Sequence, residues 1–281
     1  MAWYSDYITV YEKDYVYNPN IIEPIKERIY RLQSKKPIAT ISVIAYNEER
    51  HLLSCLWSLS NIKTDFPIEI LGVDNGSSDK TAQIFKDCGV PFYTEQRHSA
   101  GFARECGLKH SNGKLLNGMD GDTMYPDKYA DVMIKELLLP GYVGVSSSWS
   151  YYPDKNHKRL ELFFYENLRD IYLWIQSFKR PELSVRGMAF AFNADFAKKE
   201  GFQTNIKRGE DGSMALALKK YGKLKFIHNR NFRPVTGYGT LSKDGTLFNS
   251  FKIRLIKSIK YLPNLLHSKD KYEDDESNLI H

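Results

Sequence analysis

From Ala39 onward, short β-branched and apolar runs alternate with segments of helical periodicity. This alternation restricts the possible folds more than any other feature of the sequence. Buried strands are predicted over 39–45, 68–73, 91–94 and 114–119, from their length and apolar content. Helices are predicted between them, over 47–59, 77–86 and 99–110, with Asn47 and either Ser77 or Ser78 as N-caps. Strands that alternate with helices indicate βαβ units and a mainly parallel sheet.

The flanking parts of the sequence are less regular. Strands are predicted over 142–147, 188–192 and 223–228, and helices over 22–32, 158–178, 194–200, 211–221 and 248–262. The segment 158–178 is rich in Phe, Tyr, Leu and Trp, and we interpret it most simply as core, with acceptor contacts as the alternative. The helix over 248–262 is basic and amphipathic and precedes an acidic tail. It either lies on an anionic membrane or packs on the domain.

The composition excludes several classes of protein. The chain has 281 residues, 42% hydrophobic and 26% charged, which is typical of a folded domain with a sizeable core. A net charge of +6 suits an anionic ligand or a membrane surface, but it is too small to indicate nucleic acid. The three cysteines form no Cys-x-x-Cys pair and are predicted to be reduced thiols. Without an evident signal peptide or transmembrane run, we expect a cytoplasmic protein, peripheral at most on the inner face of a membrane.

Four polar loops carry the candidate chemistry. They read AYNEE at 45–49, VDNGSSD at 73–79, MDGD at 119–122 and RGEDG at 208–212. The first three follow predicted strands, and open α/β sheets bind ligands beyond the carboxyl ends of their strands. Each loop alone has an ordinary interpretation, because Asp-Gly pairs form turns and acidic residues favour helix N-termini. Their meaning therefore depends on their combination.

The combination resembles the family 2 glycosyltransferases, which have the GT-A fold. The segments AYNEE, VDNGSSDKT, GFARECGL, MDGDT and GEDGSMALALKKYGK occur in the order of that family, over roughly residues 37–228. The resemblance implies a Rossmann-like mixed α/β sheet flanked by helices, with N- and C-terminal extensions. It implies a catalytic domain over 38–247. This domain follows an N-terminal arm over 1–37, which is predicted to be mostly irregular apart from its short helix, and precedes the basic helix and acidic tail over 248–281. Within the domain, 38–122 would bind nucleotide and 123–247 would bind acceptor.

The resemblance also implies roles for individual residues. Asp211 stands at the position of the catalytic base, and Asp122 at that of a ligand for a divalent Mn²⁺ or Mg²⁺ ion. His228 would be a further metal ligand, with an ordinary solvated or core-edge histidine as the alternative. The residues implied in nucleotide binding are Ala45, Tyr46, Glu48, Asp74, Asn75, Arg104 and Asp120. Those implied in sugar or acceptor binding are Gly121, Gly187, Met188 and Glu210.

The sequence departs from the family pattern in three places. Asn75 replaces a second aspartate, which leaves the choice of base open because an amide accepts without charge assistance. Cys106 stands where the family often has asparagine, and no arginine-rich motif follows His228. The last difference puts the C-terminal phosphate contacts in question.

The resemblance therefore implies an inverting glycosyltransferase. Its donor would be a nucleotide-diphosphate sugar, with UDP favoured, and its acceptor a saccharide or lipid-linked glycan. Nucleic acid is not expected as a partner, and peripheral membrane contact would run through 248–266. One alternative is a GT-A-like module that binds sugar nucleotide or carbohydrate without turnover, although such a module need not retain both Asp122 and Asp211. The other is a nucleotidyltransferase, which would carry a glycine-rich basic loop after the first strand, where this chain has AYNEE.

Overall fold

The computed structural model describes residues 2–153 and 157–237, so the predicted basic helix and acidic tail lie outside the described residues. The helices are α1 (Pro19–Leu32), α2 (Leu52–Ser60), α3 (Thr81–Asp87), α4 (Ala100–His110), α5 (Tyr129–Leu137), α6 (Arg159–Lys179), α7 (Ala194–Glu200) and α8 (Glu210–Leu218). The strands are β1 (Ala39–Ala45), β2 (Ile68–Asp74), β3 (Phe92–Thr94), β4 (Leu115–Asp120), β5 (Thr123–Met124), β6 (Tyr142–Ser147), β7 (Ser150–Tyr151), β8 (Phe190–Asn193), β9 (Lys223–Ile227) and β10 (Val235–Thr236). Short 3₁₀ turns occupy Tyr7–Thr9, Pro181–Ser184, Gly187–Ala189 and Arg230–Phe232.

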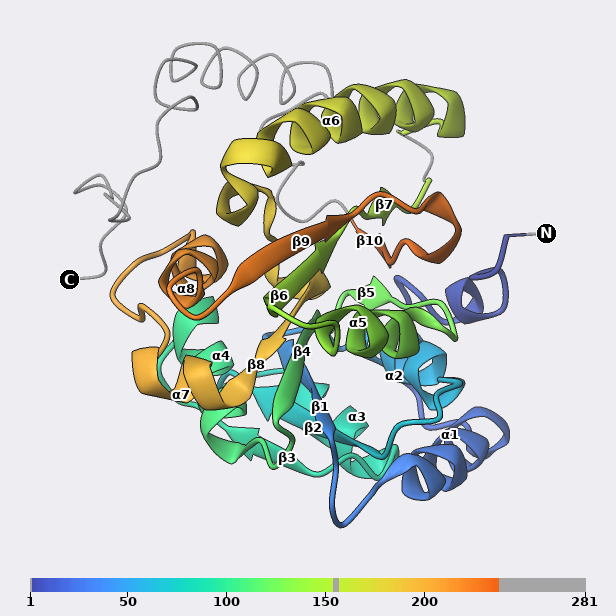
Figure 1. Cartoon of the computed structure of the whole chain (residues 1–281). Coiled ribbons are helices and arrows are strands. Elements are labelled where there is room, and N and C mark those ends of the chain that lie inside the picture. The colour runs from blue at the N-terminus through green and yellow to red at the C-terminus, as the bar shows by residue number, and fades with distance from the viewer. Residues whose placement is uncertain (1, 154–156, 238–281) are drawn as a thin grey trace.

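A mixed sheet forms the centre of the molecule (Figure 1). Within the described residues its strand order is β3-β2-β1-β4-β8-β6-β9. The strands β3, β2, β1 and β4 run parallel to one another, and β8 is antiparallel to both β4 and β6. Strands β5, β10 and β7 form a second, small sheet. The prediction of a mixed α/β sheet flanked by helices is confirmed.

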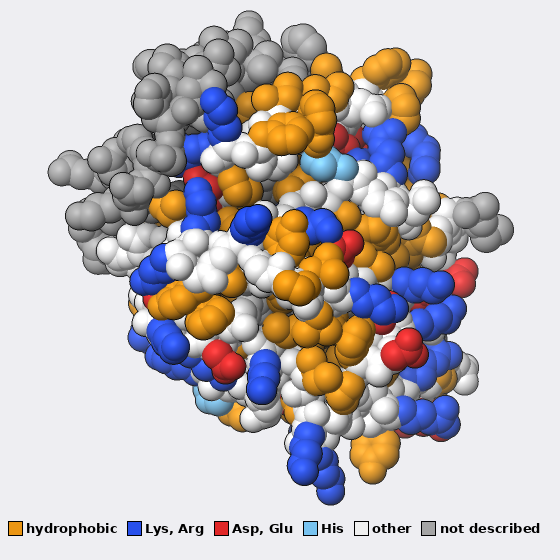
Figure 2. Space-filling model, viewed as in Figure 1, with side chains coloured by type: hydrophobic (Ala, Val, Ile, Leu, Met, Phe, Trp, Pro, Cys, Tyr) orange, Lys and Arg blue, Asp and Glu red, His pale blue; other side chains and the backbone are white. Residues whose placement is uncertain are grey.

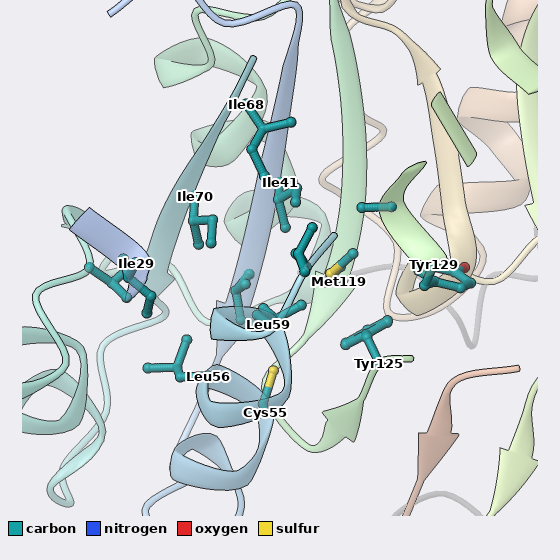
Figure 3. Packing of buried hydrophobic residues seen from close by; sticks show 14 of the residues in the cluster. Ile29, Ile41, Cys55, Leu56, Leu59, Ile68, Ile70, Met119, Tyr125 and Tyr129 are labelled. Atoms are coloured by element: carbon teal, nitrogen blue, oxygen red, sulfur yellow. The ribbon is translucent and has the colours of Figure 1, made fainter. Parts of the chain in front are cut away.

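Helices cover both faces of the main sheet. Helices α1, α2 and α5 pack on one face, and α4, α7 and α8 on the other (Figure 1). On the first face, Ile41 of β1 and Met119 of β4 point toward Leu56 and Leu59 of α2, and all four are fully buried (Figure 3). Burial of each such side chain contributes about 1.5–3 kcal/mol. This packing holds the strand ends, and the loops that follow them, in fixed positions.

The N-terminal arm contains the short helix that the sequence predicts. The predicted short helix begins at Pro19, where the side chain of Asn18 accepts a hydrogen bond from the amide of Asn20. Proline suits this first position because its missing N–H would be unpaired there in any case. The helix buries Ile22, Ile25 and Ile29 completely against the main core. Helix α1 therefore packs on the main core, whereas the other described residues of the arm, 2–18 and 33–37, are mostly irregular apart from the 3₁₀ turn at Tyr7–Thr9.

Two helices start later than predicted. Helix α2 begins at Leu52 and not at Asn47, because Asn47 has a φ of +54° that no α-helix accommodates. Helix α3 begins at Thr81, and neither Ser77 nor Ser78 caps it. The polar residues read as caps instead bond one another across the two loops, so the predicted caps were wrong.

The strand predicted over 188–192 also starts later, at Phe190. Residues 187–189 form a 3₁₀ turn instead, in which the Ala189 amide donates a hydrogen bond to the Arg186 carbonyl at 2.8 Å.

Helix α6 has an apolar face that the rest of the described structure leaves exposed. Its large exposed side chains are Leu160, Phe163, Phe164, Leu168, Ile171, Trp174, Ile175 and Phe178. Figure 2 shows hydrophobic side chains gathered at the top of the molecule, where Figure 1 places α6. The interpretation of this segment as core is therefore wrong for one side of the helix and right for the other, where Leu162, Tyr165 and Leu173 are buried. Among the described residues, no helix is long and apolar enough to span a bilayer.

Candidate active site

The carboxyl ends of three parallel strands bring the predicted loops together. In the pairing of β1 with β2, Ala45 lies opposite Asp74, and in that of β1 with β4, Ile44 lies opposite Asp120. The loops after these strands therefore emerge side by side at one edge of the sheet. Gly209 precedes α8 with a left-handed φ of +101°, and the helix begins at Glu210.

A cleft of about 810 Å³ opens at this edge. Seven of the predicted site residues line it: Arg104, Asp120, Asp122, Gly187, Met188, Glu210 and Asp211. Its volume suits a ligand of the size of a nucleotide sugar, since small-molecule sites typically measure roughly 300–1,000 Å³. The cleft thus combines the Asp-Gly-Asp loop with the start of α8, which lies almost 90 residues further along the chain.

Arg104 connects these two parts of the cleft. Its guanidinium is buried, with Nη2 at 2.9 Å from Oδ1 of Asp120 and Nε at 2.8 Å from Oδ1 of Asp211. The same Nε lies 3.4 Å from Oε1 of Glu210. Burial opposes the charged form, but the surrounding carboxylates outweigh it and raise the pKa of Arg104. Arg104 also lines the cleft, so its predicted contact with the nucleotide stays a prediction beside these carboxylate contacts.

Gly187 provides the space that Arg104 occupies. A Cβ atom built on Gly187 would lie 1.9 Å from Nη2 and 2.1 Å from Cζ of Arg104, so any side chain here would collide with the guanidinium. The hydroxyl of Tyr125 accepts a hydrogen bond from the Asp120 amide and donates one to the Met188 carbonyl, both at 3.0 Å. The segment around Gly187 is therefore fixed directly against the end of β4.

Asp211 is a largely buried carboxylate at the start of α8. Burial raises its pKa to about 8, although Arg104 acts in the opposite direction, and the neighbouring Glu210 adds to the increase. A carboxylate with a raised pKa is a stronger base than an ordinary aspartate once its proton has left. Asp211 lines the cleft, so a hydroxyl bound there has access to it.

Asp122 stands in a cluster of negative charge. Burial, followed by the charges of Glu48 and Asp120, raises its pKa to about 7. The hydroxyl of Thr123 donates to its Oδ1 at 2.8 Å, and that of Thr236 lies 3.4 Å from the same oxygen. Carboxylate oxygens are the ligands that a hard divalent cation prefers, and such a cation would also offset the mutual repulsion of the carboxylates. The residues therefore fit a metal, although no three His, Cys, Asp or Glu side chains in the described ranges form a ready-made metal cluster.

The loops after β1 and β2 are bonded to each other. The Asn47 amide donates to Ser77 Oγ and the Ser78 amide to Asn47 Oδ1, both at 2.9 Å, and the Glu48 amide donates to the Thr81 hydroxyl at 2.8 Å. Tyr46 is half exposed and packs its ring 5.3 Å from that of His98. These bonds explain the positive φ of Asn47. They leave the ring of Tyr46 exposed.

The side chains of Asp74 and Asn75 have structural partners. Oδ1 of Asp74 accepts from the Ser77 amide at 3.2 Å, and Nδ2 of Asn75 donates to the carbonyls of Glu95 and Arg97 at 3.0 and 2.7 Å. The amide at position 75 therefore ties the loop to the segment after β3, a contact that a second aspartate could not make as a donor. Neither side chain, nor those of Ala45, Tyr46 and Glu48, lines the large cleft itself.

Two predicted site residues lie elsewhere. Gly121 packs against β1, where its amide donates to the Ile44 carbonyl at 2.9 Å and an added Cβ would approach that of Ala45 to 3.0 Å. It therefore packs on β1 and does not line the large cleft, and its contact with the sugar stays a prediction. His228 packs on Phe226 with ring centroids 4.6 Å apart, and burial lowers its pKa. Asp170 and Arg233 are its charged neighbours, so its surroundings differ from those of Asp122.

The structure also brings in residues to which the sequence assigned no individual role in the site. Further residues that line the cleft include Trp149, Tyr151, Glu182, Arg186, Lys207, Arg208 and Thr236. The hydroxyl of Tyr11 donates to the Asp122 carbonyl at 3.0 Å, and His51 Nδ1 lies 2.6 Å from Glu48 Oε2. The i, i+3 spacing of Glu48 and His51 was a usable signal, whereas nothing in the sequence linked Tyr11 to a residue more than a hundred positions away.

Comparison with known proteins agrees with this geometry. Residues 40–197 match the model of a protein family described as glycosyl transferase family 2. A chondroitin synthase of Escherichia coli is 25% identical over 258 residues, which cover 85% of this chain and 36% of that protein. The glycosyltransferase AglE of Haloferax volcanii is 28% identical over 98 residues, covering 32% of each protein. The chain thus spans about a third of the length of these curated relatives.

Solved structures share the fold at low sequence identity. The mannosyltransferase PcManGT of Pyrobaculum calidifontis, solved with GDP-Man and Mn²⁺, superposes with a TM-score of 0.54 at 17% identity, covering 84% of this chain and 68% of that one. TarS (residues 1–349) of S. aureus, solved with UDP-GlcNAc, gives a TM-score of 0.51 at 17% identity, with coverages of 71% and 58%. These similarities confirm the GT-A fold of this chain.

Proposed function

Because this chain belongs to glycosyl transferase family 2, we propose that it transfers a sugar, with inversion, from a nucleotide-diphosphate donor to an acceptor hydroxyl. The observation that carries this proposal is the ion-pair arrangement of Arg104 in the cleft. That side chain joins Asp120, at the end of β4, to Asp211, at the start of α8. Asp120 on the donor side and Asp211 on the acceptor side therefore line the same cleft.

Asp122 is the proposed anchor of the donor diphosphate. A divalent cation, Mn²⁺ or Mg²⁺, when bound there supplies positive charge to the diphosphate as it leaves. Magnesium sites commonly use one or two protein carboxylates and take further ligands from phosphate and water. That preference agrees with the absence of a three-residue cluster from the described residues. The PcManGT structure and a structure of glucosyl-3-phosphoglycerate synthase from Mycobacterium tuberculosis were both solved with Mn²⁺.

Asp211 is the proposed base. In a single displacement, the acceptor oxygen forms a bond to the anomeric carbon while the bond from that carbon to the diphosphate oxygen breaks. The proton of the acceptor hydroxyl passes to the Asp211 carboxylate, and the electron pair of the broken bond stays on the diphosphate. Burial raises the pKa of Asp211 to about 8, which suits this role because a base with an ordinary aspartate pKa would retain the proton poorly.

The donor base would be recognised beside the two bonded loops. Tyr46 offers an exposed ring for stacking, and the backbone after Ala45 and Asp74 lies next to it. We favour a UDP-sugar, as in the complexes of TarS with UDP-GlcNAc and of the glucosyl-3-phosphoglycerate synthase with UDP. A saccharide or lipid-linked glycan would enter from the side of Gly187, Met188 and Glu210, where Trp149 and Tyr151 also line the cleft.

The decisive experiment measures nucleotide release. The full chain is incubated with UDP-, GDP- and dTDP-sugars, with Mn²⁺, Mg²⁺ or excess chelator, with and without candidate acceptors. Release that depends on the sugar nucleotide and the metal supports a glycosyltransferase. Binding of a sugar nucleotide without any release would favour the non-catalytic module. Formation of a sugar nucleotide from a sugar phosphate and a nucleoside triphosphate would favour the nucleotidyltransferase.

Contact with a membrane through residues 248–266 is a further proposal. Phe251, Leu255, Ile259 and Leu262 repeat at helical spacing, with Lys and Arg residues between them. Such a helix lies on anionic bilayers. In the alternative the helix packs on the domain, for which the exposed face of α6 offers an apolar surface. Co-sedimentation with anionic liposomes, with and without residues 248–281, separates the two, because only the membrane arrangement predicts weaker sedimentation of the truncated chain.

A further inference from the structure

A second pocket lies next to the active-site cleft. It measures about 410 Å³ and lies between the N-terminal arm, β7, α6 and the turn before β10. Its lining residues include Trp3, Tyr4, Tyr151, Arg159, Phe163, Glu166, Arg230 and Arg233. Tyr151 lines both this pocket and the large cleft, so the two cavities share one wall. A chain-like ligand in the cleft could therefore extend into the pocket.

Arg233 gives the pocket a buried positive charge that its protein partners do not fully balance. The residue is 5% exposed, and its Nη2 pairs with Oδ2 of Asp170. Its Nη1 is 3.9 Å from Oε2 of Glu166, and its Nε has no hydrogen-bond partner in the described part of the chain. Burial lowers the pKa of Arg233 despite the nearby Asp170, and the charges of Arg169 and Arg230 act in the same direction as burial. An anionic ligand would offset this positive charge.

Two further arginines stand at the pocket. Nη1 of Arg159 donates to the hydroxyl of Tyr4 at 3.0 Å. Nη2 of Arg230 donates to Asn167 at 2.6 Å, and its guanidinium lies 5.2 Å from the ring centroid of Phe163. Both arginines are exposed, and each retains donors beyond those used in these contacts.

The acidic residue in the pocket is already engaged. Oε1 of Glu166 accepts from the Tyr151 amide at 2.8 Å, and its Oε2 accepts from the Ser150 hydroxyl at 3.2 Å. This carboxylate therefore serves mainly to hold β7 against α6. Because three arginines face one engaged carboxylate, the net charge of the lining is positive.

Aromatic rings supply the other half of the recognition surface. Trp3, Tyr4, Tyr151 and Phe163 line the same pocket, and Trp3 is 38% exposed. Flat rings pack against the C–H faces of sugars, and the planar guanidinium fork matches carboxylate and phosphate oxygens. Rings and guanidinium groups around one cavity therefore suit a sugar that carries an anionic group.

We propose that this pocket binds an acidic sugar unit of the acceptor, one that carries a carboxylate or a phosphate group, and so positions the acceptor for transfer in the adjacent cleft. The proposal rests on the proposed function, because it treats the ligand in the cleft as a growing or modified saccharide. It specifies the chemical class of the acceptor, which the proposed function leaves open.

Calorimetric titration of the full chain, without nucleotide, tests the proposal. The probes are a tetrasaccharide that contains glucuronate, the same tetrasaccharide with its carboxylates reduced to alcohols, and glucose 6-phosphate. The variants are Arg230→Gln and Arg159→Gln, in which exposed side chains are replaced so that the fold is retained. The control is Arg31→Gln, an exposed arginine on α1 that pairs with Glu27.

We expect at least one charged probe to bind more tightly than the neutral tetrasaccharide. Each pocket variant should weaken that binding by roughly 10- to 100-fold, the usual worth of a hydrogen bond to a charged group, and Arg31→Gln should not. The probe that binds identifies the anionic group as carboxylate or phosphate. Equal binding of the charged and neutral probes, no binding of any probe, or equal weakening by the control would overturn the proposal.

A separate measurement tells this failure from a failure of the proposed function. Nucleotide release by the unaltered chain, with donor and metal but no acceptor, depends on the cleft alone. If release occurs while charged probes show no preference, the pocket proposal is wrong and the proposed function stands. If no donor is turned over but charged probes bind as expected, the proposed function is wrong, and the pocket binds acidic sugars for another purpose.

Discussion

The Nε atom of Arg104 lies 2.8 Å from Oδ1 of Asp211, and this contact fixes the proposed base relative to the donor side of the cleft. Arg104 belongs to α4 and Asp211 to α8, and a second nitrogen of the same guanidinium bonds Asp120 at the end of β4. One buried cation thus sets the distance between carboxylates from separate elements. It also limits how far Asp211 can move.

Replacement of Asp211 by Asn should abolish most turnover. The amide keeps the shape of the side chain but cannot accept the proton of the acceptor, so we expect a loss of roughly 10²- to 10⁴-fold. Donor affinity should change little, because the damage is confined to the acceptor side. Steady-state kinetics combined with titration of the donor nucleotide measures the two effects separately. Near-normal turnover would remove Asp211 from the base position.

The pH profile should report the same residue. Burial raises the pKa of Asp211 to about 8, so the carboxyl is protonated below that pH and inactive as a base. Turnover at saturating metal should therefore rise about tenfold per pH unit below pH 8 and level off above it. In Asp211→Asn the residual activity should show no such limb. A rising limb that persists in the variant would assign the titration to another group.

Asp122→Asn should weaken the binding of the donor rather than that of the acceptor. Its carboxylate is the proposed metal ligand, and an amide oxygen offers no charge to the cation. We expect a sharp loss of donor affinity and activity in the variant, and loss of activity in excess chelator for the unaltered chain. Titration of Mn²⁺ in the presence of nucleotide measures the effect directly. Full activity in excess chelator would exclude the metal role.

Gly187→Ala should lower activity, although it removes no group that takes part in the proposed reaction. The added Cβ would lie 1.9 Å from Nη2 of Arg104, whose side chain is buried between Gly187 and the carboxylates that it pairs with. Arg104 must then shift away from Asp120 and Asp211, and overpacking of this kind typically costs about 1–3 kcal/mol of stability. We expect at least a tenfold loss of activity, with thermal unfolding still cooperative.

Gly141→Ala is the matched control for that variant. Gly141 has a φ of +83°, and an added Cβ would meet nothing within 4 Å. The control therefore measures backbone strain of a Gly→Ala change without any collision, at a cost of about 1 kcal/mol. If both variants lose stability but only Gly187→Ala loses activity, the effect belongs to the displacement of Arg104. Equal losses of activity would contradict the proposed role of Gly187.

The sequence alone was sufficient for the order and type of the elements that form the site. Local periodicity predicted β1, β2, β4 and α4, and the loop motifs predicted which strand ends would carry function. These features depend on neighbours within a few positions, where the alternation of apolar residues is directly visible. Membership of glycosyl transferase family 2 was likewise carried by short segments in a fixed order, and the match over residues 40–197 confirms it.

Only the tertiary structure decided which side chains act together. Arg104 has the expected position on α4, but its partners Asp120 and Asp211 are 16 and 107 residues away, as the numbering shows. Asn47 is a residue type that commonly caps helices. Its hydrogen bonds with the next loop instead hold it at a positive φ, which excludes it from the helix. The apolar residues of α6 have the spacing of a core helix on both sides, although the described structure covers only one. Such outcomes depend on how distant segments pack, and periodicity within one segment carries no information about what lies against it.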